Sequence, residues 1–141
     1  MAQKGNLEII REWYATLNPE ILDENVDWRL ADGFPADGRY HGRRAVFEDW
    51  WPRLAAQFDD WKATPERFLD AGEAVVVLGH YTGRARATGR AFEVPFAHVW
   101  SMRNGRIVKL DHYTNTLLLH RAITEPTRAG ATAGSAPAAD D

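Results

Sequence analysis

The sequence predicts an α+β domain in which helices come first and a meander of antiparallel strands follows. Two patterns support this prediction. Apolar residues recur at three- and four-residue spacing in the first part of the chain, whereas short strand-forming stretches separated by turn signals fill the part after residue 60. The chain has 141 residues, the size of one compact domain, so a second full domain is excluded.

The first helix is predicted over residues 7–17, because apolar side chains lie along one of its faces. This face consists of Leu7, Ile10, Tyr14 and Leu17. The Asn18-Pro19 pair ends the helix. The same pair can open a short second helix over residues 19–25, with the asparagine as N-cap and the proline at the first helical position.

A strand is predicted to begin at residues 26–30, and residues 31–42 form a long loop rich in glycine and aspartate. The third helix begins near Arg43 and bends at Pro52, since proline cannot continue a regular helix. Its buried side is expected to consist of Phe47, Trp50, Trp51, Leu54 and Phe58.

Four strands are predicted after the third helix. They cover residues 61–69, 74–86, 92–102 and 107–116. Asn104-Gly105 is the strongest short hairpin signal in the chain. Residues 117–123 either extend the last strand or form a helical turn. Residues 125–141 are small and punctuated by Pro and Gly, so we expect a disordered tail after a single domain of residues 1–124.

Composition and charge exclude several classes of function. Seventeen Lys and Arg against twenty Asp and Glu give a net charge of -3, without the basic field that a nucleic-acid surface needs. There is no Cys, so disulfides, thiolate catalysis and cysteine metal sites are excluded. No signal segment and no apolar run long enough to span a bilayer is seen. We therefore expect a cytoplasmic protein with neither nucleic acid nor membrane as a partner.

Two histidines and an aspartate lie in the predicted hairpin of residues 92–116, and its register decides which of them share a face. A plain two-residue Asn-Gly turn pairs His98 with Asp111, which would be an acid–base pair. A bulge at the glycine of the turn instead pairs His98 with Leu110 and places it on the same face as His112.

The alternation of side-chain size favours the bulged register. On the first strand of the hairpin the even positions are bulky and the odd ones small, and on the second strand Lys109 and Asp111 occupy odd positions that are costly to bury. We therefore expect His98 and His112 on the inner face of the sheet and Asp111 on the outer one.

Three stretches of sequence, together with this order of elements, resemble the nuclear-transport-factor-2-like superfamily. They are Val-Asp-Trp at residues 26–28, the segment from Gly33 to Val46, and Phe-Ala-His-Val-Trp at residues 96–100 followed by Asn-Gly-Arg-Ile-Val. Within the superfamily the chain resembles SnoaL-like polyketide cyclases and ketosteroid-isomerase-like proteins over residues 6–120. The resemblance implies a curved mixed sheet wrapped against three helices into a cone with an apolar pocket, and a homodimer formed through the sheet.

The resemblance also implies which residues act. The cyclases resemble this chain at His98, but fourteen residues later, where they hold an acid–base Asp, the chain has His112. The ketosteroid isomerases place a Tyr near the middle of the first helix, which corresponds to Tyr14 or its neighbour Trp13. Their general-base Asp falls at or beside Trp28, with Asp27 and Asp32 nearby, and this position therefore departs from the family pattern.

Two functions from different classes follow. The first is a cofactor-free enzyme that moves a proton alpha to the carbonyl of a hydrophobic compound, with His98 or His112 as base or acid, Tyr14 as enolate donor and Asp27 as a candidate base. The second is a non-catalytic small-molecule-binding or dimerisation module, in which the histidines are core residues satisfied by backbone or Tyr hydroxyls. Two His without a third ligand make an incomplete metal site, so neither metal nor cofactor is expected.

Large rings are expected to line the pocket, because aromatic walls with few polar groups are typical of small-molecule sites. They suit a small hydrophobic ligand, such as a flat polycyclic compound. The predicted lining residues are Trp13, Trp28, Phe34, Trp50, Trp51, Tyr81, Phe96, Trp100 and Leu110.

Overall fold

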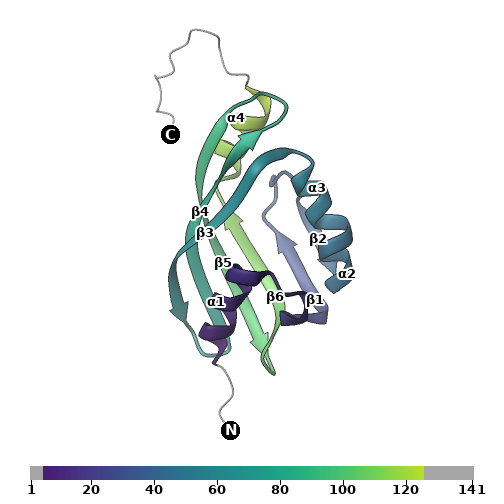
Figure 1. The fold of residues 1–141 in the computed structure, drawn as a ribbon, viewed down its shortest axis with the longest axis vertical. Coiled ribbons are helices and arrows are strands. Elements are labelled where there is room, and N and C mark those ends of the chain that lie inside the picture. The colour runs from purple at the N-terminus through teal and green to yellow at the C-terminus, as the bar shows by residue number, and fades with distance from the viewer. Residues whose placement is uncertain (1–4, 126–141) are drawn as a thin grey trace.

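One six-stranded sheet organises the computed structural model, which describes residues 5–125 (Figure 1). Its strands are β1 (Leu22–Leu30), β2 (Gly38–His41), β3 (Phe58–Asp70), β4 (Ala74–Ala85), β5 (Ala91–Arg103) and β6 (Arg106–Thr114). They lie in the order β2-β1-β6-β5-β4-β3. The pair β1–β6 is parallel and the other pairs are antiparallel. The predicted α+β class and the four-stranded meander, β3 to β6, are confirmed.

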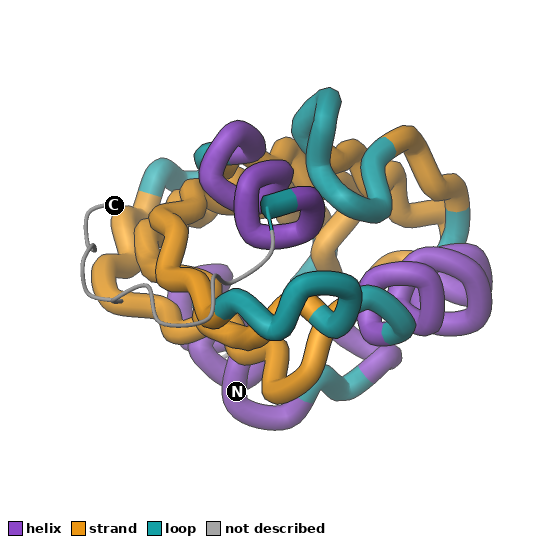
Figure 2. The backbone as a smooth tube through the Cα atoms, turned by 90° about the horizontal axis from the view of Figure 1, so that it is seen from above, coloured by secondary structure: helices purple, strands orange, loops and turns teal. Residues whose placement is uncertain are grey.

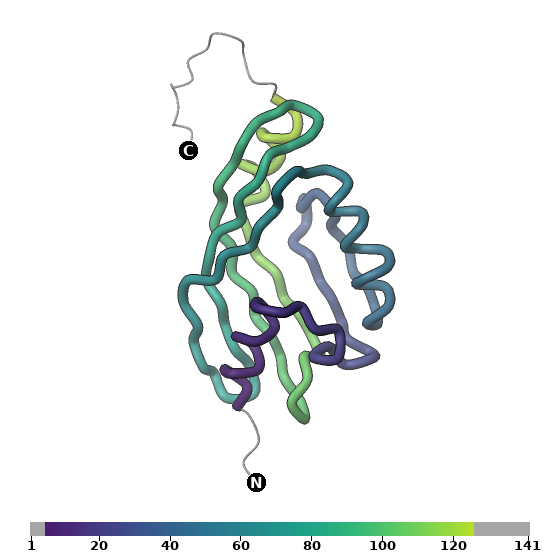
Figure 3. The backbone as a smooth tube through the Cα atoms, viewed as in Figure 1, coloured from purple at the N-terminus to yellow at the C-terminus, as the bar shows by residue number. Residues whose placement is uncertain are grey.

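The helical elements lie before, between and after the strands. They are α1 (Asn6–Thr16), the 3₁₀ turn η1 (Pro19–Ile21), α2 (Arg43–Ala45), the π turn η2 (Val46–Trp50), α3 (Trp51–Ala55) and α4 (Thr116–Thr124). Figure 2 shows the strands as a curved wall rather than a flat layer, and Figure 3 follows the chain from α1 at one end of the molecule to α4 at the other. No helix in the described part of the chain is both long and apolar enough to cross a membrane.

The predicted second helix is correct only for its first turn. Asn18 accepts a hydrogen bond from the Glu20 N–H, as an N-cap does, but the helical turn ends at Ile21. The rest of the predicted helix belongs to β1, in which Leu22 and Val26 are fully buried. Pairing with β6 and burial of these two side chains outweigh the local helix signal.

The structure corrects two further predictions and decides one alternative that the sequence left open. The predicted loop of residues 31–42 contains β2, which pairs with β1 and so forms an edge of the sheet. The third helix forms, with the π turn η2 just ahead of Pro52, but Phe58 begins β3 instead of extending the helix. Of the two alternatives for residues 117–123, the helical one is correct. The predicted tail lies outside the described residues, apart from Glu125.

The β5–β6 hairpin combines a two-residue turn with a bulge elsewhere. Asn104 and Gly105 form the turn, with φ angles of 52° and 75°. The extra residue lies at Val108 in β6, and the register beyond it pairs His98 with His112. The predicted pairing of His98 with Leu110 is therefore wrong, because the bulge lies in the strand and leaves the tight turn intact.

The shared inner face of the two histidines is confirmed. His98 is 6% exposed and His112 is 3% exposed. Asp111 lies on the other face, where its carboxylate is 3.6 Å from Nζ of Lys109. The bulge changes which residues pair across the hairpin. It does not change which face of the sheet His98 and His112 occupy, so the faces predicted from the alternation are correct.

A glycine allows the sheet to bend around its concave face. A Cβ atom at Gly79 in β4 would overlap the carbonyl oxygen of Thr64 and would lie 2.7 Å from Cζ of Phe96. The β3–β4 register shifts beside this point, between Pro65 and Arg67. The bulge in β3 and the missing side chain at Gly79 together let the backbone of β3 approach β4 closely. This close approach curves the sheet.

Replacing Gly79 by Ala is predicted to lower the free energy of unfolding by about 2 kcal/mol or more, because the new methyl group meets a strand backbone that has no room to move. Urea-induced unfolding followed by tryptophan fluorescence measures the change. Gly5→Ala is the control, since nothing lies within 4 Å of a Cβ there, and it should cost no more than about 1 kcal/mol. Equal losses in the two variants would contradict the proposed close approach.

Candidate functional site

A cavity of about 70 Å³ lies inside the curve of the sheet, between α1, the segment from η2 to α3, and the inner faces of the strands. It is lined by Trp13, Tyr14, Leu17, Trp28, Leu30, Trp50, Trp51, Trp61, Ala63, Tyr81, His98, Trp100, Leu110 and His112. Its walls are mostly aromatic carbon. Two Tyr and two His contribute to the wall, and their hydroxyl oxygens and ring nitrogens are hydrogen-bonded to each other.

Two of the predicted lining residues lie behind the wall instead. Phe96 stacks on the ring of His98, with ring centroids 4.0 Å apart, and Phe34 packs edge-on against His112 at 4.6 Å. Both rings exclude water from the histidines. Four further residues line the cavity without having been predicted from the sequence: Leu17, Leu30, Trp61 and Ala63. Of these, Trp61 and Ala63 alternate along β3, which is the signal that would have found them.

His98 forms the centre of the polar side. Its Nδ1 lies 2.5 Å from the hydroxyl oxygen of Tyr14, and its Nε2 lies 2.6 Å from the hydroxyl oxygen of Tyr81. The same Tyr81 hydroxyl oxygen also lies 2.9 Å from Nε2 of His112. Tyr14 comes from α1, Tyr81 from β4, and the two His from β5 and β6, so the curve of the sheet brings four elements to one point.

Fixed donors end this hydrogen-bonded chain on both sides. The indole N–H of Trp100 donates to the Tyr14 hydroxyl at 2.9 Å, and the backbone N–H of Ala31 donates to Nδ1 of His112 at 3.1 Å. We call the six groups, from Trp100 through Tyr14, His98, Tyr81 and His112 to Ala31, the Tyr–His chain.

Burial keeps every titratable member of the Tyr–His chain uncharged. Desolvation lowers the pKa of His98 well below its ordinary value, and the neighbouring His112 lowers it further. Desolvation also lowers the pKa of His112 to about 3. Burial raises the pKa of Tyr14 and of Tyr81 well above the ordinary value of a phenol. At neutral pH the chain therefore consists of two neutral imidazoles and two neutral phenols.

The donors at the two ends determine the direction of their hydrogen bonds. Because the Ala31 N–H can only donate, Nδ1 of His112 accepts, and the single ring hydrogen of His112 lies on Nε2 and is donated to Tyr81. Because an indole N–H can only donate, Tyr14 accepts from Trp100.

The middle of the chain has two arrangements of equal hydrogen bonding. With the His98 hydrogen on Nδ1, His98 donates to Tyr14 and accepts from Tyr81; with the hydrogen on Nε2, both directions reverse. Six groups each bring one hydrogen to five contacts. One phenolic hydrogen is thus left over, on Tyr14 in the first arrangement and on Tyr81 in the second.

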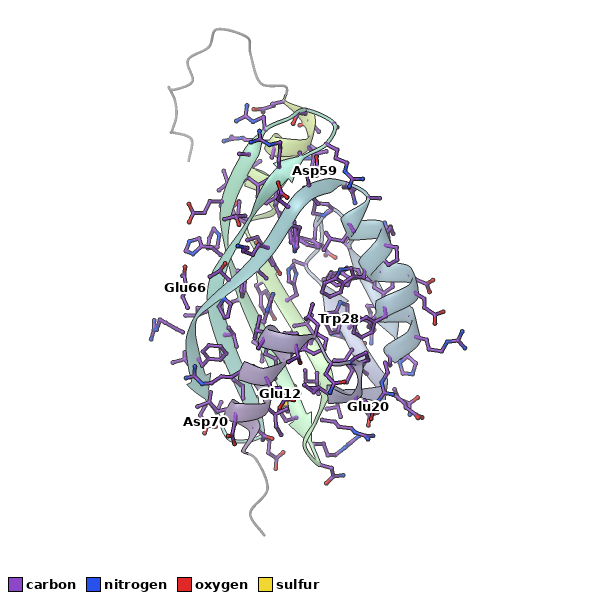
Figure 4. All side chains as sticks on the ribbon, viewed as in Figure 1. Glu12, Glu20, Trp28, Asp59, Glu66 and Asp70 are labelled. Carbon is purple, nitrogen blue, oxygen red and sulfur yellow. The ribbon has the colours of Figure 1, made fainter. Side chains whose placement is uncertain are left out.

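A second unused donor lies in the same cavity wall. The indole N–H of Trp28 is buried and has no hydrogen-bond partner among the described residues. Figure 4 shows Trp28 in the interior between the sheet and the helices, whereas the labelled acidic residues Glu66 and Asp70 lie at the outer edge. Buried donors almost always find an acceptor in native proteins, so an unpartnered indole N–H is an exception.

The predicted base Asp27 lies away from this cavity. It neighbours Trp28 on β1, so it faces the opposite side, and its carboxylate lies 3.1 Å from Nη2 of Arg39 and 3.5 Å from Nε of Arg29. Of the described residues, no carboxylate lines the cavity. Within residues 5–125, no three His, Cys, Asp or Glu side chains gather as ligands of a metal ion.

Comparisons with known proteins match this architecture. A family model for the SnoaL-like domain matches residues 7–110. An NTF2-like protein from Burkholderia thailandensis is 29% identical, with a TM-score of 0.81 over 85% of this chain and 98% of its own. TerC, co-crystallised with polyporic acid, is 22% identical, with a TM-score of 0.74 over 83% of this chain and 96% of its own. A comparison with curated proteins finds no match.

A third solved structure has the ketosteroid-isomerase-like fold. It comes from Catenulispora acidiphila, was solved in complex with trimethylamine, and is 20% identical, with a TM-score of 0.68 over 82% of this chain and 92% of its own. The helices, the curved mixed sheet and the matched residues agree with the resemblance predicted from sequence. This chain therefore belongs to the SnoaL-like domain family and has the NTF2-like fold that ketosteroid-isomerase-like proteins share.

Proposed function

We propose that the chain binds a small, neutral, largely apolar carbonyl compound in this cavity, without a cofactor. The observation that supports the proposal is the unpartnered Trp28 N–H, whose side chain is only 2% exposed. A buried donor without a partner costs about 1–3 kcal/mol, and a ligand oxygen would remove that cost. The surplus phenolic hydrogen of the Tyr–His chain is the second donor available to such an oxygen.

The size of the cavity restricts the ligand. A cavity of about 150 Å³ is known to hold benzene, and drug-sized ligands occupy at least about 300 Å³. At about 70 Å³ this cavity matches a compound of four or so non-hydrogen atoms. Two structural neighbours, solved with polyporic acid and with trimethylamine, support the use of this fold for holding organic molecules.

The geometry favours binding over proton transfer at carbon. A general base needs a free lone pair and a conjugate acid with a pKa near the working pH. His98 and His112 each have both ring nitrogens in hydrogen bonds, and burial makes both rings weak bases. Tyr14 keeps the role predicted for it, as a donor to a ligand oxygen.

The homodimer through the sheet stays a prediction.

Acetone is predicted to bind in the cavity and to move the indole N–H resonance of Trp28 downfield in ¹H–¹⁵N spectra. A ligand of four heavy atoms gains at most about 6 kcal/mol, so the Kd lies above tens of micromolar. Tyr14→Phe is predicted to weaken acetone binding by up to about fivefold, since one neutral hydrogen bond contributes about 1 kcal/mol and the surplus hydrogen lies on Tyr14 in one of the two arrangements. The indole N–H resonance of Trp28 is identified by its absence from the spectrum of the Trp28→Phe variant.

Two controls make this titration specific. Tyr113→Phe removes a hydroxyl from an exposed side chain and should leave the acetone affinity unchanged. The hydrocarbon 2-methylpropene has the shape of acetone without its oxygen, and its affinity should not respond to Tyr14→Phe. An acetone titration that shifts no cavity resonance, or an equal response of both probes to the variant, would refute the proposal.

The stability of the protein is predicted to fall as the pH drops below about 6.5. Above that pH His98 and His112 are neutral in both states; below it the unfolded chain binds protons that the folded chain, with lowered pKa values, does not. Unfolding should take up close to two protons between about pH 6 and pH 5. The free energy of unfolding then falls by about 2.7 kcal/mol per pH unit, as urea titrations at several pH values will show.

Single variants distinguish the protons taken up by His98 and His112 from protons taken up by other groups. His112→Gln should reduce the number of protons taken up by about one. His120→Gln, on the exposed side of α4, should leave the slope as in the parent protein. A parent protein whose stability is flat between pH 6.5 and pH 5 would show that the two buried rings are protonated in the folded state.

A further inference from the structure

The cavity reaches the surface of the protein on one side. Most of its lining residues are buried, but some are also partly exposed to solvent, and such residues lie at the boundary between the cavity and water. They come from the end of α1, the start of α3 and the first half of β3, and both helices contact β3 (Figure 1). We call them the mouth; they are Tyr14, Leu17, Trp51, Trp61 and Ala63.

The three aromatic residues of the mouth are held in place by their neighbours. The Tyr14 hydroxyl belongs to the Tyr–His chain. The ring of Trp61 lies against that of Tyr81, with centroids 4.5 Å apart, and Trp51 packs edge-on against Trp50 at 5.3 Å. Moving any of these rings would break packed contacts, so they form a fixed frame.

The other two residues of the mouth differ in length. Ala63 has a single methyl group, which no rotation displaces. Leu17 has a branched aliphatic side chain that rotates about two bonds, and it is 37% exposed. Of the five residues, Leu17 therefore combines the reach to cover the mouth with the freedom to move aside.

The backbone at Leu17 supports a role for its side chain. Leu17 ends α1 in the left-handed conformation, with φ 54° and ψ 36°, and its N–H donates to the carbonyl of Trp13 at 2.8 Å. Helices that end in this way usually have glycine or asparagine there, because a larger side chain is unfavourable in the left-handed region. A leucine at such a position indicates that its side chain is needed, and the place of this side chain at the mouth supplies the reason.

We propose that Leu17 is the gate of this cavity. Its side chain covers the mouth, sets how fast a ligand enters and leaves, and restricts entry to compounds smaller than benzene. This role rests on the proposed binding function and deepens it, since it names the residue that selects ligands by size. The gate is tested with hydrocarbons, which need no hydrogen-bond donor, so that the gate and the binding of a carbonyl compound fail separately.

Two substitutions change the gate in opposite directions. Leu17→Gly removes the side chain and suits the left-handed backbone, so the variant is expected to fold. Leu17→Phe enlarges the side chain. The exchange rate of 2-methylpropene should rise at least about fivefold in Leu17→Gly and fall by about the same factor in Leu17→Phe. Line shapes of the methyl resonances of Leu30 and Leu110, which line the cavity, measure this rate during titration.

Benzene tests selection by size. A cavity that holds benzene has a volume of about 150 Å³, so benzene should leave the Leu30 and Leu110 resonances of the parent protein unchanged and should shift them in Leu17→Gly. Leu69→Ala is the matched control. Leu69 is 40% exposed, much as Leu17 is, but it does not line the cavity, and its truncation should change neither the exchange rate nor the response to benzene.

A substitution that merely loosened the fold would speed exchange whether the new side chain were smaller or larger. The gate is therefore refuted if exchange changes in the same direction in Leu17→Gly and Leu17→Phe, or is unchanged in both. It is also refuted if the parent protein binds benzene as Leu17→Gly does, or if no hydrocarbon binds. If the hydrocarbons behave as expected and acetone does not bind, the gate stands and the proposed carbonyl ligand is wrong.

Discussion

The rest of the site depends on the need to satisfy two imidazoles that lie inside an apolar fold. A buried histidine in water-free surroundings is stable only when it is neutral and hydrogen-bonded at both ring nitrogens. Tyr81 meets this need for both rings at once, and Tyr14 completes it for His98. The helix that supplies Tyr14 and the strand that supplies Tyr81 are therefore held to the β5–β6 hairpin by polar contacts as well as by packing.

This constraint explains why the polar groups of the cavity act as one unit. The backbone and indole donors set the directions of the hydrogen bonds at the two ends, and the position of the single His98 hydrogen sets the directions of the two bonds in the middle. Charge at any point would break the sequence of donors and acceptors and would be expensive in this environment. A network of this kind suits a ligand that stays neutral, and it provides no strong base for proton abstraction from carbon.

The sequence predicted the fold class, the meander and the face shared by His98 and His112, because alternation and turn residues are local signals. It did not predict β2, the bulge in β6 or the bridging role of Tyr81. These depend on the curvature of the assembled sheet, which Gly79 and the β3 bulge produce through contacts between strands. The Tyr81 hydroxyl on β4 contacts histidines on β5 and β6, and such a contact produces no periodic pattern in the sequence of any one strand.

At or beside Trp28 the chain departs from the residue pattern of the ketosteroid isomerases. At or beside the position where the resemblance to ketosteroid isomerases implies a carboxylate base, this chain has a buried indole N–H without a hydrogen-bond partner among the described residues. The carboxylate next to it, Asp27, faces away and lies beside two arginines. Among the described residues no carboxylate therefore lines the cavity, and this lack of a carboxylate base is the reason that we propose ligand binding rather than proton abstraction.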